Sequence, residues 1–361
     1  MCGIAGILRW DDRPVDRAAL GRMVETLEHR GPDAHGLTVV GPVGLGHTRL
    51  SIIDLAGGAQ PMTSADGTLT VTFNGEIYNY LELRQELIGL GHRFASDSDT
   101  EVLLSAYAQW GEDCVRRFNG QWAFAIWDAR RQVLFASRDR FGKRPFFYAV
   151  VNRSLMFASE IKALLAVPEV PRAVDPVGLD QLLTFWSTLP TRTIFQGIRQ
   201  LPAAHSLVVE RGEVRVTRYW NLDFSPPADE SSTADLEDRL LALLTDATGL
   251  RLRSDVPVGA YLSGGLDSTI TAALAKQLNR GRLCTFSVEF ESPEFDESGF
   301  QQEVVRHLGT DHRTLRCSFD DVARVFPQVI RHAETPILRT APAPMFLLSQ
   351  LVRDAGYKVV L

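Results

Sequence analysis

The sequence has no long apolar segment. None of its hydrophobic runs approaches the ~20 consecutive residues that a transmembrane helix requires. The first residues also lack the basic stretch followed by an apolar core that marks a secretory signal peptide. These two absences argue against a membrane protein and predict a cytoplasmic location.

Positive charge and cysteine are both scarce. The 361 residues include 38 Lys and Arg against 44 Asp and Glu, which gives a net charge of −6. Because phosphate affinity comes mainly from basic side chains, this balance argues against a nucleic-acid-binding protein. The four cysteines show neither CxxC spacing nor a metal-ligand grouping, so we expect free thiols and neither a metal site nor a disulfide. They are Cys2, Cys114, Cys284 and Cys317.

The order of the predicted elements divides the chain into two domains. In residues 1–220, strands, helices and further strands follow one another, which predicts an α+β domain with sheets packed between helices. Residues 225–232 read Ser-Pro-Pro-Ala-Asp-Glu-Ser-Ser, a composition typical of an exposed linker, and we place the linker at 221–233. In residues 234–361, helices and strands alternate, which predicts an α/β domain with a doubly wound parallel sheet.

The second domain ends on an apolar segment, 358–361, that reads as a strand. In a doubly wound sheet the ligand-binding loops leave the carboxyl ends of the strands. From the sequence alone we therefore expect this domain to be incomplete at its C-terminus.

A cysteine follows the initiator methionine directly. If Met1 is removed, Cys2 carries a thiol and a free α-amine on one residue. An unperturbed α-amine has a pKa of about 7.7–8.0, so it can accept the thiol proton and serve as the base of a nucleophilic enzyme. The alternative is a small buried hydrophobic residue near a chain end.

Residues suited to acyl transfer follow later in the first domain. Asn74 and Gly75 offer a side-chain amide and a backbone N–H for an oxyanion hole, although Asn-Gly is also a hairpin signal. Arg49 can clamp an α-carboxylate, and its alternative is a surface ion pair. Asp99 can pair with an α-ammonium group, and its alternative is a helix N-cap.

A glycine-rich segment in the second domain predicts a phosphate site. Residues 263–268 read Ser-Gly-Gly-Leu-Asp-Ser, between a predicted strand at 258–262 and a predicted helix at 268–279. Backbone N–H groups of the glycines and the helix N-terminus both favour an anion. The spacing does not fit the Walker pattern, and a purely structural strand-to-helix turn is the alternative.

Together these motifs resemble the glutamine-hydrolysing asparagine synthetases. The motifs of the first domain are similar to class II glutamine amidotransferases, which have an N-terminal-nucleophile fold of four αββα layers. They are Cys2-Gly3-Ile4, Arg30-Gly31-Pro32-Asp33, Arg49-Leu50-Ser51-Ile52, Phe73-Asn74-Gly75-Glu76-Ile77-Tyr78-Asn79 and Arg138-Asp139-Arg140-Phe141-Gly142. Residues 263–268 and 286–290 resemble an ATP-pyrophosphatase domain, and the likeness covers nearly the whole chain.

The resemblance implies two half-reactions and the residues that serve them. Cys2 attacks the side-chain amide of glutamine and releases ammonia, while ATP activates aspartate as β-aspartyl-AMP in the second domain. The implied glutamine ligands are Arg49, Asn74, Gly75, Glu76 and Asp99. The implied ATP ligands are Leu262, Ser263, Gly264, Gly265, Asp267, Ser268 and Val288, with Mg²⁺ held through the phosphates. The partners are then the small molecules glutamine, aspartate and ATP, and a homodimer is possible.

The segment expected to bind the acceptor resembles the family less closely. Residues 334–342 lie where the family binds its acceptor and resemble its bacterial branch only loosely. A related amidotransferase acting on another carboxylate, or a glutaminase-only fragment, are therefore alternatives. Because the family continues past a strand like 358–361 into a catalytic loop, we expect this chain by itself to hydrolyse glutamine and to make no asparagine.

Overall fold

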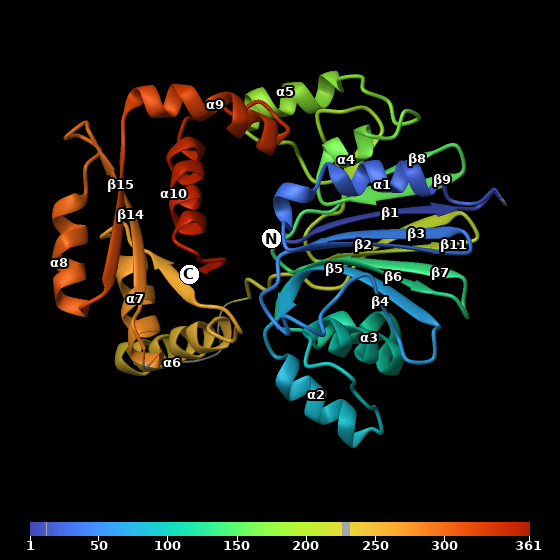
Figure 1. Cartoon of the computed structure of the whole chain (residues 1–361), viewed down its shortest axis with the longest axis horizontal. Coiled ribbons are helices and arrows are strands. Elements are labelled where there is room, and N and C mark those ends of the chain that lie inside the picture. The colour runs from blue at the N-terminus through green and yellow to red at the C-terminus, as the bar shows by residue number, and fades with distance from the viewer. Residues whose placement is uncertain (12, 226–231, 280) are drawn as a thin grey trace. The chain divides into compact units, whose positions relative to one another are not determined.

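The chain folds as two compact units. The computed structural model describes residues 1–11, 13–225, 232–279 and 281–361 (Figure 1). Unit 1 is Met1–Asp223 and unit 2 is Phe224–Leu361. Of the expected linker at 221–233, residues 226–231 lie outside the described part.

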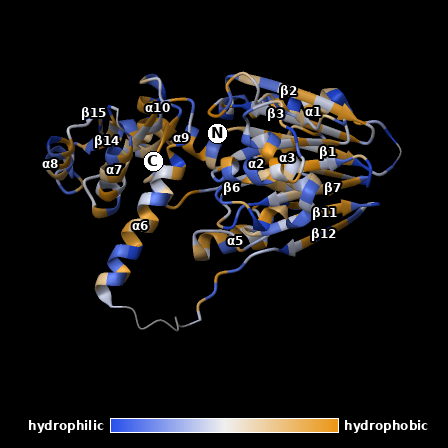
Figure 2. Ribbon diagram, turned by 90° about the horizontal axis from the view of Figure 1, so that it is seen from below, coloured by the Kyte–Doolittle hydropathy of each residue, from blue (hydrophilic) through white to orange (hydrophobic). Residues whose placement is uncertain are grey.

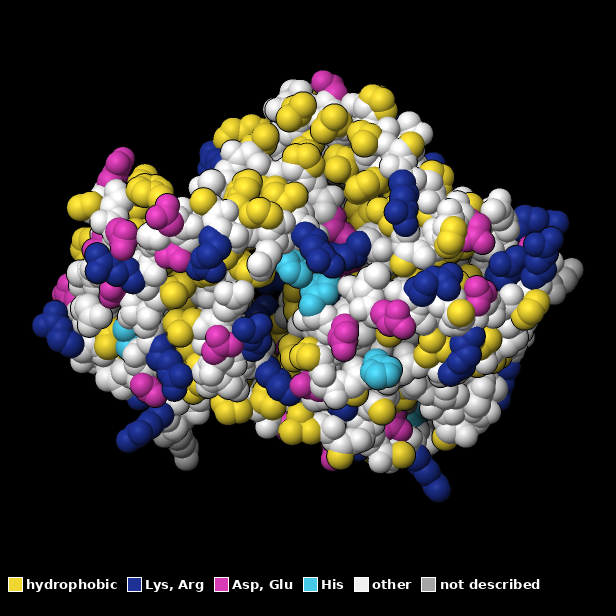
Figure 3. Space-filling model, turned by 45° about the horizontal axis from the view of Figure 1, so that its top comes forward, with side chains coloured by type: hydrophobic (Ala, Val, Ile, Leu, Met, Phe, Trp, Pro, Cys, Tyr) yellow, Lys and Arg dark blue, Asp and Glu magenta, His cyan; other side chains and the backbone are white. Residues whose placement is uncertain are grey.

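Neither a membrane-spanning helix nor a surface of one charge sign stands out. No helix in the described ranges is long and apolar enough to cross a bilayer. On the face drawn in Figure 3, Lys and Arg side chains are interspersed with Asp and Glu. This mixed face agrees with the small net charge of −6.

Unit 1 contains two antiparallel sheets of six strands each. The first sheet consists of β1 (Gly3–Arg9), β2 (Ala34–Val40), β3 (Val43–Arg49), β8 (Phe147–Val151), β9 (Ser154–Ala158) and β10 (Ile198–Gln200). The second consists of β4 (Met62–Thr63), β5 (Leu69–Ile77), β6 (Gly120–Asp128), β7 (Val133–Arg138), β11 (His205–Glu210) and β12 (Glu213–Arg218). Their strand orders are β10-β8-β9-β1-β3-β2 and β12-β11-β7-β6-β5-β4.

Helices cover the outer faces of both sheets (Figure 1). Helices α1 (Arg17–Glu25) and α4 (Ile161–Leu165) pack on the first sheet, and α2 (Tyr80–Gly89) and α3 (Asp99–Trp110) pack on the second. A third apolar cluster, with Ile4, Leu45 and Trp127, fills the space between the sheets. These layers are the expected αββα sandwich. The remaining helical pieces of unit 1 are η1 (Glu28–Arg30), η2 (Gly111–Arg116) and α5 (Pro176–Phe185).

Strand β1 is a continuous run without polar residues from Ile4 to Leu8 because both of its faces are buried. Ile4 and Leu8 belong to the cluster between the sheets, whereas Ala5 and Ile7 belong to the cluster under α1 and α4. Because side chains alternate along a strand, burial of both faces requires apolar residues at every position. The strands of both sheets carry hydrophobic residues along their length for the same reason (Figure 2).

Some local predictions need correction. The apolar spacing of residues 15–29 predicts a single helix, but α1 ends at Glu25 and the chain continues into the short 3-10 turn η1. Strands β4 and β10 were not predicted because they contain only two and three residues. The apolar segments 206–210 and 214–219, separated by Arg211-Gly212, predict a hairpin. It is confirmed as β11 and β12, with Arg211 at φ 50° and Gly212 at φ 82° at its turn.

Unit 2 is built around one parallel sheet. Its strands are β13 (Val258–Tyr261), β14 (Cys284–Phe290), β15 (Asp311–Cys317) and β16 (Val359–Val360), in the order β15-β14-β13-β16. Helices α7 (Leu266–Leu278) and α8 (Ser298–Leu308) pack in one apolar cluster with Leu262, and α9 (Phe319–Ala333) and α10 (Pro342–Asp354) pack in another with Val288. The doubly wound parallel sheet predicted for the second domain is therefore confirmed.

The long helix α6 (Thr233–Arg251) opens unit 2. It begins with a capping box, in which the Ser232 hydroxyl accepts from the Asp235 N–H and the Asp235 carboxylate accepts from the Ser232 N–H. Ser318 and Asp321 form the same device at the start of α9. Hydrophilic and hydrophobic residues alternate along α6 (Figure 2).

Candidate active site

The thiol of Cys2 lies at the start of β1, beside the end of β3. The Leu50 N–H donates to Cys2 Sγ over 3.4 Å, and Sγ lies 3.7 Å from the Leu50 carbonyl oxygen. Gly3 pairs with Thr48, and a Cβ atom at Gly3 would lie only 2.6 Å from Thr48 Oγ1. Glycine at position 3 therefore lets the chain start approach β3 closely.

A buried ion-pair cluster that the sequence reasoning did not select fixes the backbone of Cys2. Arg30 Nε donates to the Cys2 carbonyl over 2.9 Å, and Arg30 Nη1 donates to Glu160 Oε1 over 2.8 Å. Glu160 also accepts from His29 and Lys162. Although burial alone raises the pKa of Glu160, these hydrogen bonds hold it well below its usual range. Glu160 thus stays ionised and keeps Arg30 in place.

The Arg-Gly-Pro-Asp motif brings Arg30 to this position. A Cβ atom at Gly31 would lie 2.3 Å from the backbone carbonyl of Thr48, so only glycine permits this contact. The next residues continue the docking, because the Asp33 N–H donates to the Arg49 carbonyl and Asp33 Oδ2 accepts from the Ser51 N–H. In the sequence, this motif is indicated only by its likeness to the family. No other local pattern pointed to Arg30 as a site residue.

Asn74 and Glu76 lie on the face of β5 that looks toward the first sheet. The Thr72 hydroxyl, on the same face two residues earlier, donates to the Gly46 carbonyl of β3 over 3.0 Å. Asn74 is 1% exposed, and its Nδ2 atom has no hydrogen-bond partner within the described part of the chain. A buried donor without a partner is suited to a ligand. Asn74-Gly75 is therefore not the hairpin turn of the alternative interpretation.

Gly75 lies in the middle of the β5–β6 ladder, opposite Trp122. A Cβ atom at Gly75 would lie 2.2 Å from the Gln121 carbonyl oxygen and 2.8 Å from Trp122 Cα. A larger residue would push β5 away from β6 and would displace Asn74 with it.

Asp99 is the first residue of α3 rather than its cap. The N-cap is Ser98, whose hydroxyl accepts from the Thr100 N–H over 3.2 Å. The Asp99 carboxylate is 5% exposed and accepts from the Ile77 N–H at the end of β5 over 3.0 Å. Burial raises the pKa of Asp99 to about 7; the Ile77 N–H lowers it, and the charge of Glu76 raises it further. Asp99 therefore changes charge near neutral pH.

Arg49 is buried and bonded to a loop, so it is not a surface ion pair. Its guanidinium donates to the carbonyl oxygens of Leu55 (3.0 Å), Ile53 (3.2 Å) and Asp54 (2.6 Å). An arginine side chain has five N–H donors, of which these bonds use three. The remaining donors are available to a ligand carboxylate, and the loop fixes their direction.

A second arginine missed by the sequence reasoning, Arg144, lies near Cys2. Burial has the largest effect on the pKa values of the Cys2 thiol and of the α-amine at the chain start, and the charge of Arg144 is a smaller contribution that lowers both. The Asp139 carboxylate accepts from the N–H groups of Phe141, Lys143 and Arg144, which folds the segment after β7 into a fixed loop. The Arg138-Asp139 motif was the signal that could have led to Arg144.

The α-amine and the thiol both lie in a site of low polarity. Burial lowers the pKa of the Met1 α-amine to about 5, with a charge contribution from Cys2 in the opposite direction and from Arg30 and Arg144 in the same direction. Burial raises the pKa of the Cys2 thiol, and the Leu50 N–H and the positive charges offset part of that effect. An amine at this end of the chain is thus neutral at physiological pH and can act as a base.

In unit 2, the predicted phosphate loop lies between β13 and α7. Its two hydroxyl groups close on each other, with Ser263 Oγ 2.9 Å from Ser268 Oγ, and Gly265 N donates to Ser263 Oγ over 3.2 Å. Gly264 has φ +86°, and a Cβ atom there would lie 2.8 Å from Phe300 Cβ. Gly265 is the N-cap of α7 without a side-chain bond, and Asp267 lies in the first turn of the helix.

Topology places this loop where doubly wound sheets bind ligands. Strands β13, β14 and β15 follow one another outward, and β16 then pairs with the opposite edge of β13. The carboxyl end of β13 is therefore the switch point of the sheet, and the loop at 263–268 leaves from it.

The two predicted adenosine contacts are already engaged within unit 2. Leu262 N donates to the Phe286 carbonyl, and the Leu262 carbonyl accepts from the Ser287 hydroxyl. The Val288 carbonyl accepts from Gln301 Nε2 over 3.1 Å. Each carbonyl has a second lone pair, so a nucleotide can contact either one only in addition to these bonds. The Gln301 Oε1 atom is buried without a partner in the described residues.

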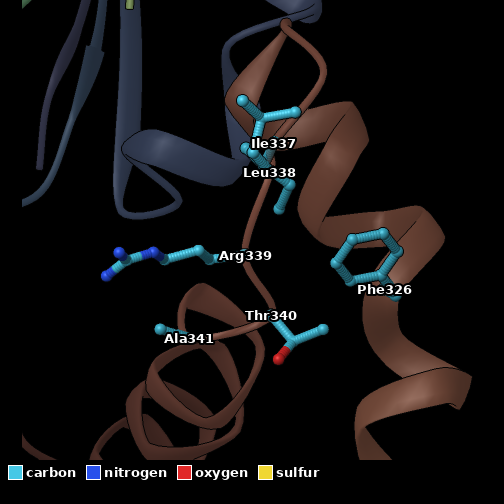
Figure 4. A pocket seen from close by; sticks show the side chains of 6 residues that line it. All are labelled: Phe326, Ile337, Leu338, Arg339, Thr340 and Ala341. Carbon is cyan, nitrogen blue, oxygen red and sulfur yellow. The ribbon is translucent and has the colours of Figure 1, made fainter. Parts of the chain in front are cut away.

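A pocket of about 460 Å³ lies along the segment expected to bind the acceptor (Figure 4). Its lining consists of Phe326, Ile337, Leu338, Arg339, Thr340 and Ala341. Four of the six lining residues are apolar, and Arg339 is the one cationic side chain among them. The described chain holds no group of three or more His, Cys, Asp or Glu that could bind a metal ion.

Comparison with known proteins identifies two families in this order. Residues 1–220 match the family described as glutamine amidotransferase domain, and residues 239–361 match asparagine synthase. Asparagine synthetase [glutamine-hydrolyzing] 3 of Bacillus subtilis is 38% identical over 93% of this chain and 57% of its own length. A putative asparagine synthetase [glutamine-hydrolyzing] 2 of Methanocaldococcus jannaschii is 36% identical over 98% of this chain and 72% of its own.

A solved structure of glutamine phosphoribosylpyrophosphate amidotransferase from B. subtilis, in complex with ADP and GMP, has a TM-score of 0.47 at 16% identity, covering 87% of this chain and 81% of that one. The chain spans little more than half the length of the B. subtilis asparagine synthetase. The two family matches and the identity to the M. jannaschii relative nevertheless agree with each other. The chain therefore belongs to the glutamine-hydrolysing asparagine synthetase family, with a glutamine amidotransferase domain followed by an asparagine synthase domain.

Proposed function

We propose that this chain serves glutamine-dependent asparagine synthesis, with Cys2 as the nucleophile that releases ammonia from glutamine. The observation that carries the proposal is the arrangement around Cys2. The Leu50 N–H holds the thiol at the end of β3, and Thr72 of β5 bonds to Gly46 of β3. On the same face of β5, the buried Asn74 Nδ2 has no partner among the described residues, and the Asp99 carboxylate lies at the end of that strand. These groups match the nucleophile, oxyanion donor and ammonium ligand that glutamine hydrolysis needs.

The first half-reaction follows from these groups. After removal of Met1, the α-amine of Cys2 accepts the thiol proton, and Sγ attacks the amide carbon of glutamine. Asn74 Nδ2 and the Gly75 N–H donate to the oxyanion, and the amine returns the proton to the leaving nitrogen as ammonia departs. Water then hydrolyses the glutamyl thioester to glutamate.

Three side chains hold the amino-acid part of glutamine in this proposal. The two unused donors of Arg49 bind the α-carboxylate, and the ionised carboxylate of Asp99 binds the α-ammonium group. Glu76 lies on the same face of β5 as Asn74 and adds a second negative charge near the ammonium. The loop carbonyls at 53–55 orient Arg49 before glutamine arrives.

Unit 2 supplies the ATP site. The backbone N–H groups of Gly264, Gly265 and the first turn of α7, with the hydroxyls of Ser263 and Ser268, bind the pyrophosphate part of ATP. Asp267 is the only carboxylate in this loop, so Mg²⁺ is bound mainly by the phosphate oxygens. Leu262 and Val288 contact the adenosine through their second carbonyl lone pairs.

Aspartate is the acceptor that family membership favours. The apolar side chains of Phe326, Ile337 and Leu338 in the pocket lining favour a second candidate, an acceptor carboxylate with a larger apolar part (Figure 4). In both cases the carboxylate is adenylated and then attacked by ammonia. We further propose domain limits of 1–220 and 234–361 with a linker at 221–233, a cytoplasmic location, and a homodimer as the assembly.

Two assays test this function. Glutamate release from glutamine, followed at several glutamine concentrations, tests the first half-reaction. Exchange of labelled pyrophosphate into ATP, measured with aspartate and with a panel of larger carboxylates, tests the second and identifies the acceptor. Exchange with a larger carboxylate but not with aspartate would exclude asparagine synthesis, and absence of glutamate release would exclude the role of Cys2.

A further inference from the structure

Arg144 is held by charged side chains at both ends of its peptide unit. Asp139 Oδ2 accepts from the Arg144 N–H over 3.0 Å, and Arg138 Nε donates to the Arg144 carbonyl over 2.7 Å. Arg138 also donates to the carbonyls of Leu201 (2.7 Å) and Gly142 (2.5 Å). The backbone at Arg144 is therefore fixed, and its side chain cannot leave the interior by a shift of the loop.

The side chain of Arg144 is buried, and one of its donor atoms has no hydrogen-bond partner among the described residues. Arg144 is 9% exposed, and its Nε atom has no hydrogen-bond partner among the residues that the structure describes. By contrast, Arg30 is paired with Glu160, and Arg49 and Arg138 each donate to three carbonyls. A buried guanidinium donor without a hydrogen-bond partner is costly, so one fixed near a nucleophile requires an explanation.

The charged groups around the nucleophile come from several elements. The α-amine of Met1, which stands in for the Cys2 α-amine freed by removal of Met1, interacts with the charges of Cys2, Arg30, Arg144 and Glu76. The thiol of Cys2 faces the amine, Arg144 and Asp99. Arg144 itself faces Glu76, Tyr78, Arg30 and Cys2. Arg144 is thus the cation that acts on both the thiol and the amine.

In its active form, the pair made by the Cys2 thiol and the α-amine shares one acidic proton. It is either a thiol beside a neutral amine or a thiolate beside an ammonium, and both carry no net charge. The inactive form at low pH holds two protons and one positive charge. A fixed cation nearby therefore favours the active form wherever its single proton resides, and a coupled pair of this kind titrates as a unit.

We propose that Arg144 is an electrostatic positioning residue of the glutaminase site, whose positive charge disfavours the doubly protonated Cys2 thiol and α-ammonium pair. The inference rests on the proposed function and assigns the site its working pH range. A unit charge within about 10 Å, at an effective dielectric constant of about 20, shifts a titration by about one pH unit.

The test compares pH profiles of glutaminase kcat at saturating glutamine for four variants, because kcat/KM also follows the charge of Asp99. Arg144→Met and Arg144→Gln remove the charge with different packing, and Arg144→Lys retains it. Lys143→Met removes an exposed cation from the same loop as a matched control. The same proteins are treated with iodoacetamide over the same pH range, and alkylation of the Cys2 peptide is followed by mass spectrometry, which requires no glutamine turnover.

The acidic limb of the kcat profile should move up by about one pH unit in Arg144→Met and Arg144→Gln, so that kcat below the limb falls about tenfold. Arg144→Lys and Lys143→Met should keep the wild-type limb, and Cys2 alkylation should shift in parallel. A rate lowered equally at every pH, with both limbs unmoved, would overturn the proposal and leave Arg144 a structural residue. A wild type without glutaminase activity would contradict the proposed function, while the alkylation profile would still decide the role of Arg144.

Discussion

Replacing Asp99 with asparagine should stabilise unit 1 and at the same time weaken glutamine binding. Asp99 is buried at the start of α3, and burial raises its pKa from 3.8 to about 7. Asparagine has the same size and keeps an oxygen that accepts from the Ile77 N–H. The substitution therefore removes the cost of a buried charge with little change in packing.

The magnitude follows from the difference between the two pKa values. Because the folded state binds this proton more tightly than the unfolded state, stability falls as pH rises from 3.8 to about 7. About three pH units at 1.36 kcal/mol per unit give a cost of up to about 4 kcal/mol, fully present above pH 7. Asp99→Asn should recover much of this at pH 8 and almost nothing at pH 4.

Urea unfolding followed by tryptophan fluorescence measures this effect in unit 1 alone. All six tryptophans of the chain lie in Met1–Asp223, at positions 10, 110, 122, 127, 186 and 220. Asp97→Asn is a matched control, because the Asp97 side chain is 92% exposed and two residues away. Equal unfolding midpoints of wild type and Asp99→Asn at pH 8 would refute the assignment of a buried, ionised Asp99.

The same variant reports on glutamine. A charge-assisted bond contributes about 1.5–3 kcal/mol, so Asp99→Asn should raise KM for glutamine more than tenfold. In the wild type, KM should rise as pH falls below about 7 because Asp99 becomes protonated. In Asp99→Asn this pH dependence should disappear.

Three further substitutions have clear expected outcomes. Cys2→Ala should abolish glutamate release while glutamine binding, measured by calorimetry, persists; wild-type rates would show that the nucleophile is elsewhere. Arg49→Ala should raise KM for glutamine more than tenfold, since a charge-assisted carboxylate contact is lost, and an unchanged KM would place the α-carboxylate elsewhere. Gly264→Ala should weaken ATP binding at least tenfold in equilibrium titration, because φ +86° and a 2.8 Å approach to Phe300 Cβ both exclude a side chain, whereas Gly299→Ala, with nothing within 4 Å, should bind normally.

The order of strands and helices was predictable from the sequence because apolar patterns are local. The strand at β13, the glycine loop at 263–268 and the start of α7 appear in the predicted sequence order, and the parallel pairing of β13 with β16 completes the predicted sheet. The turn at Arg211-Gly212 was predictable for the same reason, since Gly212 readily accepts the positive φ that the turn requires.

The remaining parts of the candidate site depend on contacts between distant segments. Arg30 meets Glu160 across 130 residues, and no local pattern encodes that pair. Arg144 becomes a site residue only because Arg138 and Asp139 fold the loop that carries it. Asn74-Gly75 carries a turn signal, yet it lies within β5 because burial of the strand outweighs the local preference.

Glutamine hydrolysis by Cys2 requires a covalent glutamyl thioester on its thiol. The chain is mixed with glutamine, quenched in acid within the first turnovers and digested, and the N-terminal peptide is identified by mass spectrometry. We expect a peptide that begins at Cys2, without Met1, and carries one glutamyl group on its thiol. Turnover of glutamine by a protein that retains Met1, or with the glutamyl group on any other residue, would contradict the account.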